Sequence, residues 1–593
     1  MNKSLLLLFF LFIVALGIIF FPKTSSQCIL IENNSSHITF YTNGSIKTIK
    51  ANINYAPHTV FNFKYNYFYS YNFKIIYPIK DRVMIKHQTN YGFEKLGNLP
   101  LKEKCYYYKV DKEGTLTLSD SNALIIGKNN LECYKDSTGK LNIFLIFPMD
   151  YSTIRTGISS SNFNSLIHSK VEIKCLNAIK IYSIRESYFI TIPKDSIITI
   201  EPLGTELKVV TKNVSKVFKE RIYLQGSSMN ITTITRGNPL FNPSYNGVLE
   251  FTLQDKGLNI INETTLEDYL CKVVPSEMPV SGGLEALKCQ AIAARTYAIS
   301  DMLANRFVSS GFHVDDSTKS QVYNNSPEKP LSNNAVLGTS GLIITYNNAP
   351  IDAKYYSSSG GTGVGYNDIW FNIDGSSEGK PYLKTSNYLS SKVALPRTEA
   401  EWLSFYKNLK LTAIDSNSPY FRWHVEFSTA AITKSLNKSL KLIYETKKDV
   451  MVIKQNDTRL KVIPELKSLQ DIKIIKRSEG GNIIEISFIF ENATVNLKWD
   501  YNIRNAIKCS SEYTNEATSI VRYKDKPIDN SIFLPSSFFS VEKLGGKFIL
   551  YGGGYGHGVG MSQNGAMELG KKGSTYSDIL NIYFKDIVIN KIY

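Results

Sequence analysis

Hydrophobic and polar positions follow three patterns in succession along this chain of 593 residues. Residues Leu5 to Phe21 form one continuous apolar run. From about residue 28 to 240, short stretches of alternating apolar and polar residues are separated by turn residues, which is typical of β-strands joined by tight turns. From residue 246 onward, a strand-like stretch is followed by apolar residues at helical spacing. The pattern predicts an α+β fold with a β-rich N-terminal region and a mixed second region.

The apolar run is near the lower limit for crossing a lipid bilayer and is longer than the usual core of a signal peptide. No Ala-x-Ala-like cleavage site follows Phe21. We therefore expect residues 1–27 to hold an uncleaved membrane anchor, with a cleaved secretion signal as the alternative. Because Lys3 precedes the run, the positive-inside rule places the N-terminus in the cytoplasm. The expected location is the cell membrane with an extracytoplasmic C-terminal region, or the cell wall if the signal is cleaved.

The length of the chain predicts more than one domain, because single cores stop growing well below this size. The polar loop at 241–247 is the expected boundary, which gives domains at 28–245 and 246–593. The formal charge of +16 is spread along the chain without a basic run. It therefore favours an anionic surface such as a cell wall, and we expect no nucleic-acid partner. Seven scattered cysteines without a C-x-x-C pair argue against a disulfide scaffold and against a thiol metal site.

One segment of the β-rich region is unusually aromatic. Phe or Tyr occupies every second position from Phe61 to Phe73. A single strand there would place all of these rings on one face of a sheet. We expect that face to pack in a sheet core, and stacking on sugars is the alternative.

The stretch VVPSEMPVSGGLEALKCQAIAARTYA, residues 273–298, places one glutamate between two prolines. Proline fixes its own φ and disfavours helix in the preceding residue, so we expect Val274 and Met278 to be extended. Glu277 would then stand on a short rigid segment. Its apolar neighbours should remove water from the carboxyl group and raise its pKa, which suits a general acid. A solvent-exposed glutamate, or one paired with Arg295, is the alternative.

A helix is expected from Leu284 onward, with Ser281 as its cap. Its small and apolar residues recur at helical spacing, which allows close approach of other backbone. The stripe consists of Leu287, Ala291, Ala294 and Ala298. We expect a buried, supporting helix.

LEDYLCKVVPSEMP, followed by LEALKCQAIAARTYA, resembles the signature of the SpoIID/LytB family. A second block near the C-terminus, YGGGYGHGVGMSQNGAMELGKKGSTYSDILNIYF, is similar to the terminal block of that family, so the resemblance covers about residues 246–593. It implies a peptidoglycan lytic transglycosylase in which Glu277 is the catalytic acid. Glu277 would protonate the oxygen between N-acetylmuramic acid and N-acetylglucosamine. It would then take the proton of the muramyl C6 hydroxyl as a 1,6-anhydro ring closes. The substrate supplies its own nucleophile, so one carboxylate suffices where glycoside hydrolases use two.

The resemblance also implies an active-site role for Arg295, which occupies the A-A-R-T-Y position; a structural anchor is the alternative. The segment IDAKYYSSSGGTGVGYNDIW fits a Ser- and Gly-rich family loop, which implies substrate contacts for Tyr356, Ser358 and Ser359. Many relatives carry His where Tyr356 stands. Trp370, at the end of this loop, is expected to pack.

The glycine-rich turn of the terminal block contains His557 and is followed by Gln563. The two side chains are expected to hydrogen-bond muramyl or N-acetyl groups, with a charge on His557 that responds near neutral pH. A buried structural histidine is the alternative. Residues 562–583 are expected to form a helical cover.

Some relatives carry cysteines and a histidine near the segment FHVDDSTKSQVY, where this chain offers only His313, Asp315 and Asp316. Structural zinc sites favour Cys and His ligands, so we expect no metal, and we expect no other cofactor. The two aspartates are expected to be turn carboxylates.

The sequence therefore predicts cleavage of peptidoglycan glycan strands outside the cytoplasm, with sporulation as one setting and a cell-wall amidase as one partner. A non-catalytic amidase enhancer is the first alternative. A wall-binding protein that uses the aromatic N-terminal region is the second.

Overall fold

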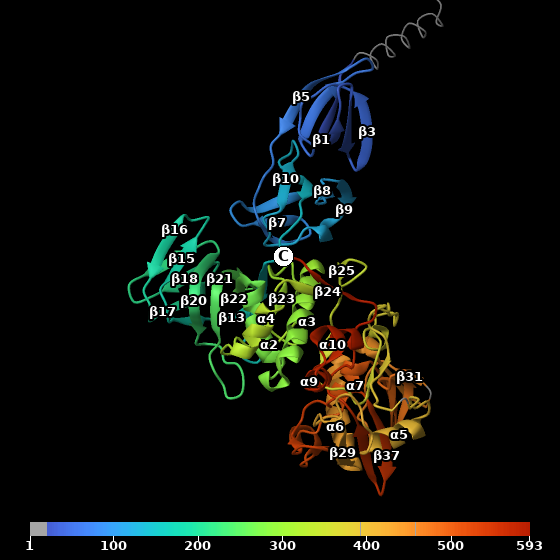
Figure 1. Cartoon of the computed structure of the whole chain (residues 1–593). Helices are drawn as coiled ribbons and strands as arrows, with labels where there is room; N and C mark the ends of the chain where they lie inside the picture. The colour runs from blue at the N-terminus through green and yellow to red at the C-terminus, as the bar shows by residue number, and fades with distance from the viewer. Residues whose placement is uncertain (1–20, 256, 392, 457) are drawn as a thin grey trace, which may run out of the picture. The chain divides into compact units, whose positions relative to one another are not determined.

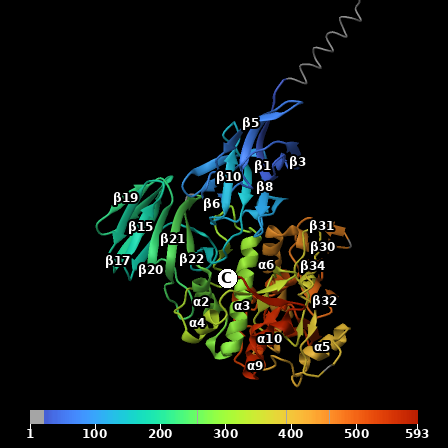
Figure 2. The same cartoon turned by 45° about the horizontal axis from the view of Figure 1, so that its top comes forward.

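The computed structural model of the chain describes residues 21–593 except residues 256, 392 and 457. The described residues form two compact units, each built from two stretches of sequence (Figures 1 and 2). Unit 1 takes in the chain up to Tyr269 together with Asp301–Ser326. Unit 2 takes in Leu270–Ser300 and Pro327–Tyr593. Strands dominate the first part of the chain and helices join them later, which confirms the predicted α+β class.

Unit 1 is built mainly from sheets (Figure 1). The first sheet has the order β3–β2–β1–β4–β5, formed by β1 (Lys23–Asn33), β2 (His37–Thr42), β3 (Ser45–Lys50), β4 (Val60–Tyr65) and β5 (Ser70–Ile76). The second has the order β10–β11–β8–β7–β6, formed by β6 (Val83–Lys86), β7 (Asn90–Phe93), β8 (Gly97–Val110), β10 (Leu131–Lys135) and β11 (Leu141–Ile146), while β9 (Leu116–Ser119) pairs with β8.

The third sheet of unit 1 contains the strands that lead to the glutamate motif. Its main path is β19–β18–β17–β14–β20–β21–β22–β12–β23. The strands are β12 (Thr153–Gly157), β14 (Val171–Cys175), β17 (Ser196–Leu203), β18 (Glu206–Val210), β19 (Ser215–Phe218), β20 (Ile222–Ile231), β21 (Ser244–Gln254), β22 (Gly257–Thr265) and β23 (Val314–Asp315). Off this path, β13 (Ile167–His168) pairs with β22, and β15 (Ile179–Ser183) pairs with β16 (Tyr188–Ile192) and β20.

The domain boundary expected between residues 245 and 246 is corrected by this sheet. The position falls inside β21, which pairs with β20 on one side and β22 on the other. A chain break there would cut a strand in the middle of its hydrogen-bonded ladder. The structure divides the chain after Tyr269 instead.

Residues 1–20 of the expected anchor at residues 1–27 lie outside the described residues. Its last residues are described, and β1 begins at Lys23, so the strand starts earlier than the end of the expected segment. Among the residues that the structure describes, no helix is both long and apolar enough to cross a bilayer.

The single aromatic strand expected from Phe61 to Phe73 is wrong, because the segment folds back as the β4–β5 hairpin. The turn follows from Asn66, whose side-chain oxygen accepts hydrogen bonds from the backbone N–H of Phe68 and Tyr69. Such Asx turns compete with continued strand structure. Core packing holds for the rings on the strands, since Phe61 and Phe63 are buried and Phe73 packs against their cluster.

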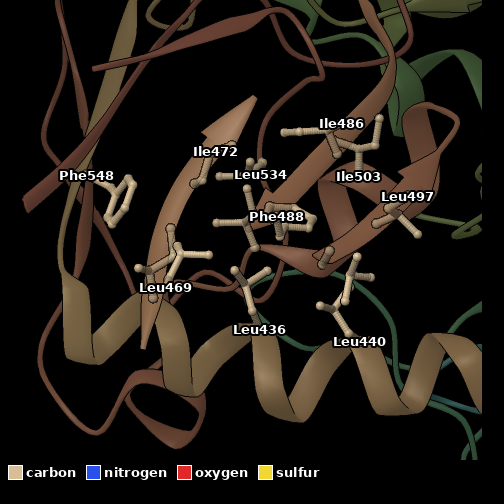
Figure 3. Close-up of a cluster of buried hydrophobic side chains, with 14 of the residues drawn as sticks. Leu436, Leu440, Leu469, Ile472, Ile486, Phe488, Leu497, Ile503, Leu534 and Phe548 are labelled. Carbon is tan, nitrogen blue, oxygen red and sulfur yellow. The ribbon is translucent and has the colours of Figure 1, made fainter. Parts of the chain in front are cut away.

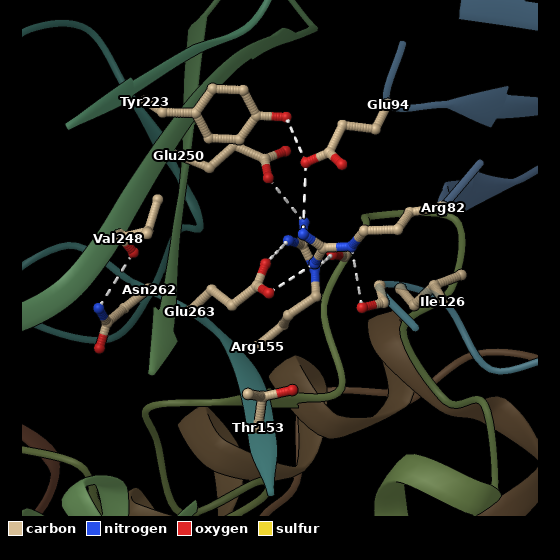
Figure 4. Close-up of polar contacts among 12 residues, drawn as sticks. Arg82, Glu94, Ile126, Thr153, Arg155, Tyr223, Val248, Glu250, Asn262 and Glu263 are labelled. Atoms are coloured by element: carbon tan, nitrogen blue, oxygen red, sulfur yellow. Dashed lines mark hydrogen bonds and ion pairs between the residues drawn. The ribbon is translucent and has the colours of Figure 1, made fainter. Parts of the chain in front are cut away.

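A buried ion-pair network stands in unit 1 (Figure 4). The guanidinium of Arg155 contacts the carboxylates of Glu250, at 2.9 Å, and Glu263, and Arg82 contacts Glu263 and Glu94. Burial alone would raise the pKa of Glu263, but the two arginines hold it below its usual value. The network therefore depends on each charge having its partner.

Unit 2 begins within α2 (Leu266–Glu277), and continues with η2 (Val280–Gly282), α3 (Leu284–Leu303) and α4 (Pro330–Leu337). Three small sheets follow: β25–β24–β40, with β24 (Leu342–Tyr346), β25 (Ala349–Pro350) and β40 (Val588–Lys591); β26 (Tyr355–Tyr356) with β39 (Met561–Ser562); and β27 (Thr362–Gly363) with β28 (Ser386–Asn387). The expected helical cover is confirmed as α9 (Gln563–Lys571) and α10 (Tyr576–Tyr583).

A hydrophobic cluster of unit 2 lies between helix α6 (Thr429–Thr446) and two sheets (Figure 3). One sheet has the order β36–β35–β29–β38–β37, with β29 (Trp423–Ser428), β35 (Ser519–Arg522), β36 (Ile528–Asp529), β37 (Phe539–Leu544) and β38 (Lys547–Gly552). The other has the order β31–β30–β34–β33–β32, with β30 (Met451–Gln455), β31 (Thr458–Leu460), β32 (Leu469–Arg477), β33 (Ile483–Phe490) and β34 (Thr494–Lys498). Helices α5 (Glu399–Lys407), α7 (Asp500–Ala506) and α8 (Ser511–Thr514) complete this part. Leu436 and Leu440 point from α6 toward Phe488 of β33, so one amphipathic helix face closes the core.

Candidate active site

Glu277 is the last residue of helix α2 and is half-buried. The extended conformation expected for Val274 is wrong, because Val274 and Pro275 both lie inside the helix. Proline removes one backbone hydrogen bond and crowds the preceding turn. Here it stands in the last turn of α2, where the neighbouring Val273 and Val274 are fully buried, and that burial supports the helix to Glu277. The side chain of Glu277 is therefore carried by a helix end that is fixed in the core.

The connection from α2 to α3 is short and tightly turned. Ser281 does not occupy the expected cap position, because it lies inside η2. Gly283, with φ of +84°, stands immediately before α3, and its carbonyl oxygen accepts the N–H of Leu287 at 3.1 Å. A side chain at this position would be strained, so glycine starts the helix. The stripe of small residues on α3 is fully buried, which confirms the expected supporting helix.

The C-terminal block packs against this connection. The side-chain amide of Gln563 donates to the backbone carbonyl of Glu277 at 3.1 Å and to the side-chain oxygen of Gln290 at 3.2 Å. The backbone N–H of Tyr576 donates to the carboxylate of Glu285 at 2.7 Å. Helices α3 and α9 lie side by side in both views of the fold (Figures 1 and 2). The two blocks that carry the sequence resemblance therefore meet at Glu277.

A buried aspartate that sequence reasoning missed ties together the loops around this meeting point. The carboxylate of Asp415 accepts the hydroxyl and the N–H of Ser359, both at 2.6 Å, and the hydroxyl of Ser562 at 2.8 Å. Ser562 in turn caps α9, the helix that begins with Gln563. Burial raises the pKa of Asp415, and the hydrogen bonds from the two serines oppose that rise. Nothing in the local sequence distinguishes Asp415 from an ordinary turn residue.

The glycine-rich turn approaches the Ser- and Gly-rich loop backbone to backbone. Ser358 and Tyr555 exchange both of their backbone hydrogen bonds, at 3.1 and 2.8 Å. Gly554 has φ of +81°, and a Cβ atom there would lie 2.9 Å from the carbonyl oxygen of Ser358. Only glycine fits both restrictions. The two loops are therefore held together through their main chains.

His557 is half-buried between aromatic rings. Its ring centroid lies 5.7 Å from that of Tyr356 and 5.1 Å from that of Trp370. Its Nδ1 accepts the N–H of Val559 at 3.1 Å. Burial, with a smaller contribution from the nearby charge of Lys354, lowers the pKa of His557 to about 3. The expectation that the charge of His557 responds near neutral pH is therefore wrong, because the imidazole is neutral there.

Tyr356 and Arg295, two further predicted site residues, are buried. Tyr356 is buried beside Ser562 in the β26–β39 pair, and burial raises its pKa well above the usual value. Arg295 is fully buried and donates to the backbone carbonyls of Leu342, at 3.0 Å, and Val336, at 3.3 Å. These contacts suit the anchor alternative, because they join α3 to α4 and β24. The catalytic role of Arg295 stays a prediction.

The segment considered for a metal lies in unit 1. Asp316 is buried against Arg236 at 2.7 Å, and Asp315 accepts the N–H and hydroxyl of Ser317. The ring of His313 is bonded on both sides to backbone groups of Arg155 and Ile126. The described part of the chain holds no cluster of three or more His, Cys, Asp and Glu side chains suited to a metal ion.

Asp415→Asn is expected to destabilise unit 2 by about 1–3 kcal/mol, because the new amide NH₂ would face the serine donors and leave them unpaired. Thermal unfolding followed by tryptophan fluorescence measures this, since Trp370, Trp402, Trp423 and Trp499 all lie in unit 2. The matched control is Asp374→Asn on an exposed turn, which should change little. An unchanged midpoint for Asp415→Asn would remove the anchoring role given to this carboxylate.

Unit 2 is expected to lose stability as the pH falls from about 6.5 toward 3. The folded-state pKa of His557, about 3, lies below the ordinary value of 6.5, so the unfolded chain binds the proton first. Between pH 6.5 and 5 this linkage amounts to about 2 kcal/mol. His557→Gln should flatten the pH dependence of the unfolding midpoint, whereas His87→Gln, at an exposed position of unit 1, should not. Equal slopes for His557→Gln and the parent would contradict this reasoning.

Comparison with known proteins finds similarity to one family over part of the chain. The family model described as SpoIID, stage II sporulation protein, matches residues 254–346. The chain is 29% identical over 314 residues to the amidase enhancer of Bacillus subtilis (strain 168), covering 53% of this chain and 39% of that protein. It is 26% identical over 348 residues to stage II sporulation protein D of Bacillus amyloliquefaciens, covering 56% of this chain and 76% of that protein. The B. subtilis stage II sporulation protein D is also 26% identical, over 349 residues.

This chain thus spans well under half of the length of the amidase enhancer and about three quarters of the length of the two sporulation proteins. The matched family segment contains both Glu277 and Arg295, so it coincides with the first of the two blocks that carry the resemblance. Residues 254–346 of this chain are therefore similar to the SpoIID family.

Proposed function

We propose that this chain acts on the bacterial cell wall during sporulation, as a lytic transglycosylase that cleaves peptidoglycan glycan strands. The relatives named stage II sporulation protein D support the setting. The arrangement around Glu277 supports the chemistry. Glu277 is the general acid and then the general base.

One observation carries the proposal. The amide of Gln563 is bonded to the carbonyl of Glu277, across 286 residues of sequence. The half-buried carboxyl group therefore stands where the C-terminal block, with its close-packed loops, meets the end of α2.

The reaction needs only this one carboxyl group. Glu277 donates its proton to the glycosidic oxygen as the bond from C1 of N-acetylmuramic acid breaks. The C6 hydroxyl oxygen of the same sugar attacks C1, and the Glu277 carboxylate takes the hydroxyl proton. One bond to C1 breaks and one forms, the proton lost in the first step is recovered in the second, and no water is consumed.

The surrounding residues hold the site in shape. Asp415 and Ser359 fix the loop that faces the glycine-rich turn, and Ser562 fixes the start of α9. His557 stays neutral near pH 7, so it can serve a sugar hydroxyl or amide by hydrogen bonding without adding charge. We place the site on the extracytoplasmic side, with residues 1–27 as the membrane attachment.

The test is digestion of purified glycan from which the stem peptides have been removed. The full chain is expected to release fragments with 1,6-anhydromuramyl ends, identified by chromatography and mass spectrometry. Fragments with reducing muramyl ends instead would assign a hydrolase that uses water. No cleavage under conditions in which the protein is folded would contradict the enzymatic proposal.

The second candidate is a non-catalytic amidase enhancer, and it is favoured by the relative that bears this name. Under that function, the chain releases no anhydromuramyl ends. It would instead raise the rate at which a cell-wall amidase cleaves intact peptidoglycan. Measuring both activities on the same preparation separates the two candidates.

A further inference from the structure

The tip of the β4–β5 hairpin carries aromatic side chains that the proposed catalytic function does not use. Tyr67, Phe68 and Tyr69 are 80%, 62% and 61% exposed. The turn beneath them is ordered, because the side-chain oxygen of Asn66 accepts the N–H groups of Phe68 and Tyr69, each at 3.0 Å. Three large exposed rings on one tight turn form a patch of the kind that marks an interaction site.

This tip lies beside the point at which the N-terminal apolar run ends. In the pairing of β1 with β4, Lys23 is opposite Tyr65. Tyr65 is the last residue of β4 and is followed at once by the Asn66 turn, while Phe21 lies two residues before Lys23. Phe21 is itself 75% exposed. The apolar run of the sequence therefore ends two residues before β1 begins, at the end of the β1–β4 pair that also carries the aromatic tip.

The charges near the tip are of one sign. Lys23 and Lys64 are exposed on neighbouring strands directly behind it. No Asp or Glu occurs in residues 21–31 or in residues 60–79. Aromatic rings at the level of lipid headgroups, with lysines close by to attract anionic lipids, are what proteins place at a membrane surface.

We propose that the β4–β5 tip inserts into the headgroup region of an anionic bilayer, beside the N-terminal segment. The inference rests on the membrane attachment proposed for residues 1–27. It assigns the first sheet of unit 1 the task of docking on the membrane surface. The tip is suited to this because its rings are presented by a hydrogen-bonded turn and lose little freedom on insertion.

Phe68→Trp in the full chain tests the proposal. The protein is reconstituted into vesicles of phosphatidylcholine and phosphatidylglycerol that contain a lipid with a quencher near the headgroup end of its acyl chain. The native tryptophans all lie in unit 2, so their signal is measured in the parent chain and subtracted. The matched control is Phe189→Trp, which is also in unit 1 and is 61% exposed.

The added tryptophan at position 68 is expected to lose more fluorescence to the quencher lipid than the one at position 189. This difference in quenching should be smaller in vesicles of pure phosphatidylcholine. It should also be smaller when the chain carries Lys23→Gln and Lys64→Gln. Equal quenching at both positions, in a chain that stays with the vesicles, overturns the docking and leaves the attachment standing. A chain that does not stay with the vesicles overturns both. Protection of position 68 from a soluble quencher by glycan, without quenching by lipid, assigns the tip to carbohydrate and also overturns the proposal.

Discussion

Glu277→Gln is expected to abolish the release of 1,6-anhydromuramyl ends from peptide-stripped glycan while the protein stays folded. Glutamine has nearly the shape of glutamate but can neither donate the proton to the glycosidic oxygen nor take one from the C6 hydroxyl. A positioned acid or base contributes about 10²- to 10⁴-fold to a rate. Because one carboxyl group serves both steps, the loss should lie toward the upper end of that range. Quantifying anhydromuramyl products over time measures it.

The matched control is Glu445→Gln, at an exposed position of α6 in the same unit. It should leave both the rate and the unfolding midpoint unchanged, since surface substitutions rarely exceed about 0.5 kcal/mol. Glu277→Gln should also keep the bond from Gln563, because that bond goes to the backbone carbonyl. Full activity in the folded Glu277→Gln protein would remove Glu277 from the catalytic role. Retained stimulation of an amidase by that variant would favour the enhancer function.

Arg155→Met is expected to destabilise unit 1 by about 3–5 kcal/mol, because removing one member of a buried ion network leaves uncompensated charge. Arg155 is almost fully buried and contacts both Glu250 and Glu263. Its Nε also donates to the carbonyl of Gly311 at 2.9 Å, a bond that links the two stretches of sequence in unit 1. Methionine can fill much of the space but can make none of these contacts.

Calorimetric unfolding measures the effect on unit 1, and tryptophan fluorescence follows unit 2 separately. Arg185→Met is the matched control, because its pair with Glu220 is about one third exposed on both sides. Exposed pairs contribute about 0–1 kcal/mol. If both arginine variants shifted the unit 1 transition equally, the buried network would not be the source of stability.

Local patterns predicted the parts of the candidate site that depend on neighbours in sequence. The stripe from Leu287 to Ala298 indicated a buried helix, and α3 is one. The apolar spacing after position 562 indicated helices, and α9 and α10 are present. Two local signals compete at Asn66, and its turn signal outweighs the alternation of the aromatic residues around it.

Other features depended on burial, which no short window of sequence reveals. Pro275 stays in a helix because its neighbours Val273 and Val274 are buried. His557 is neutral near pH 7 because its surroundings remove water from the ring. Asp415 becomes a structural carboxylate only because the hydroxyl groups of Ser359 and Ser562 converge on it.

The sequence by itself determined the fold class and the blocks that resemble the family, because strand alternation, helical spacing and a motif are all properties of consecutive residues. Only the tertiary structure decided that Gln563 bonds to the carbonyl of Glu277 and that the start of β1 pairs with the end of β4, next to the aromatic turn. Both depend on which surfaces pack and which strands pair across long stretches of chain. Those choices are made by the burial and hydrogen bonding of the whole molecule.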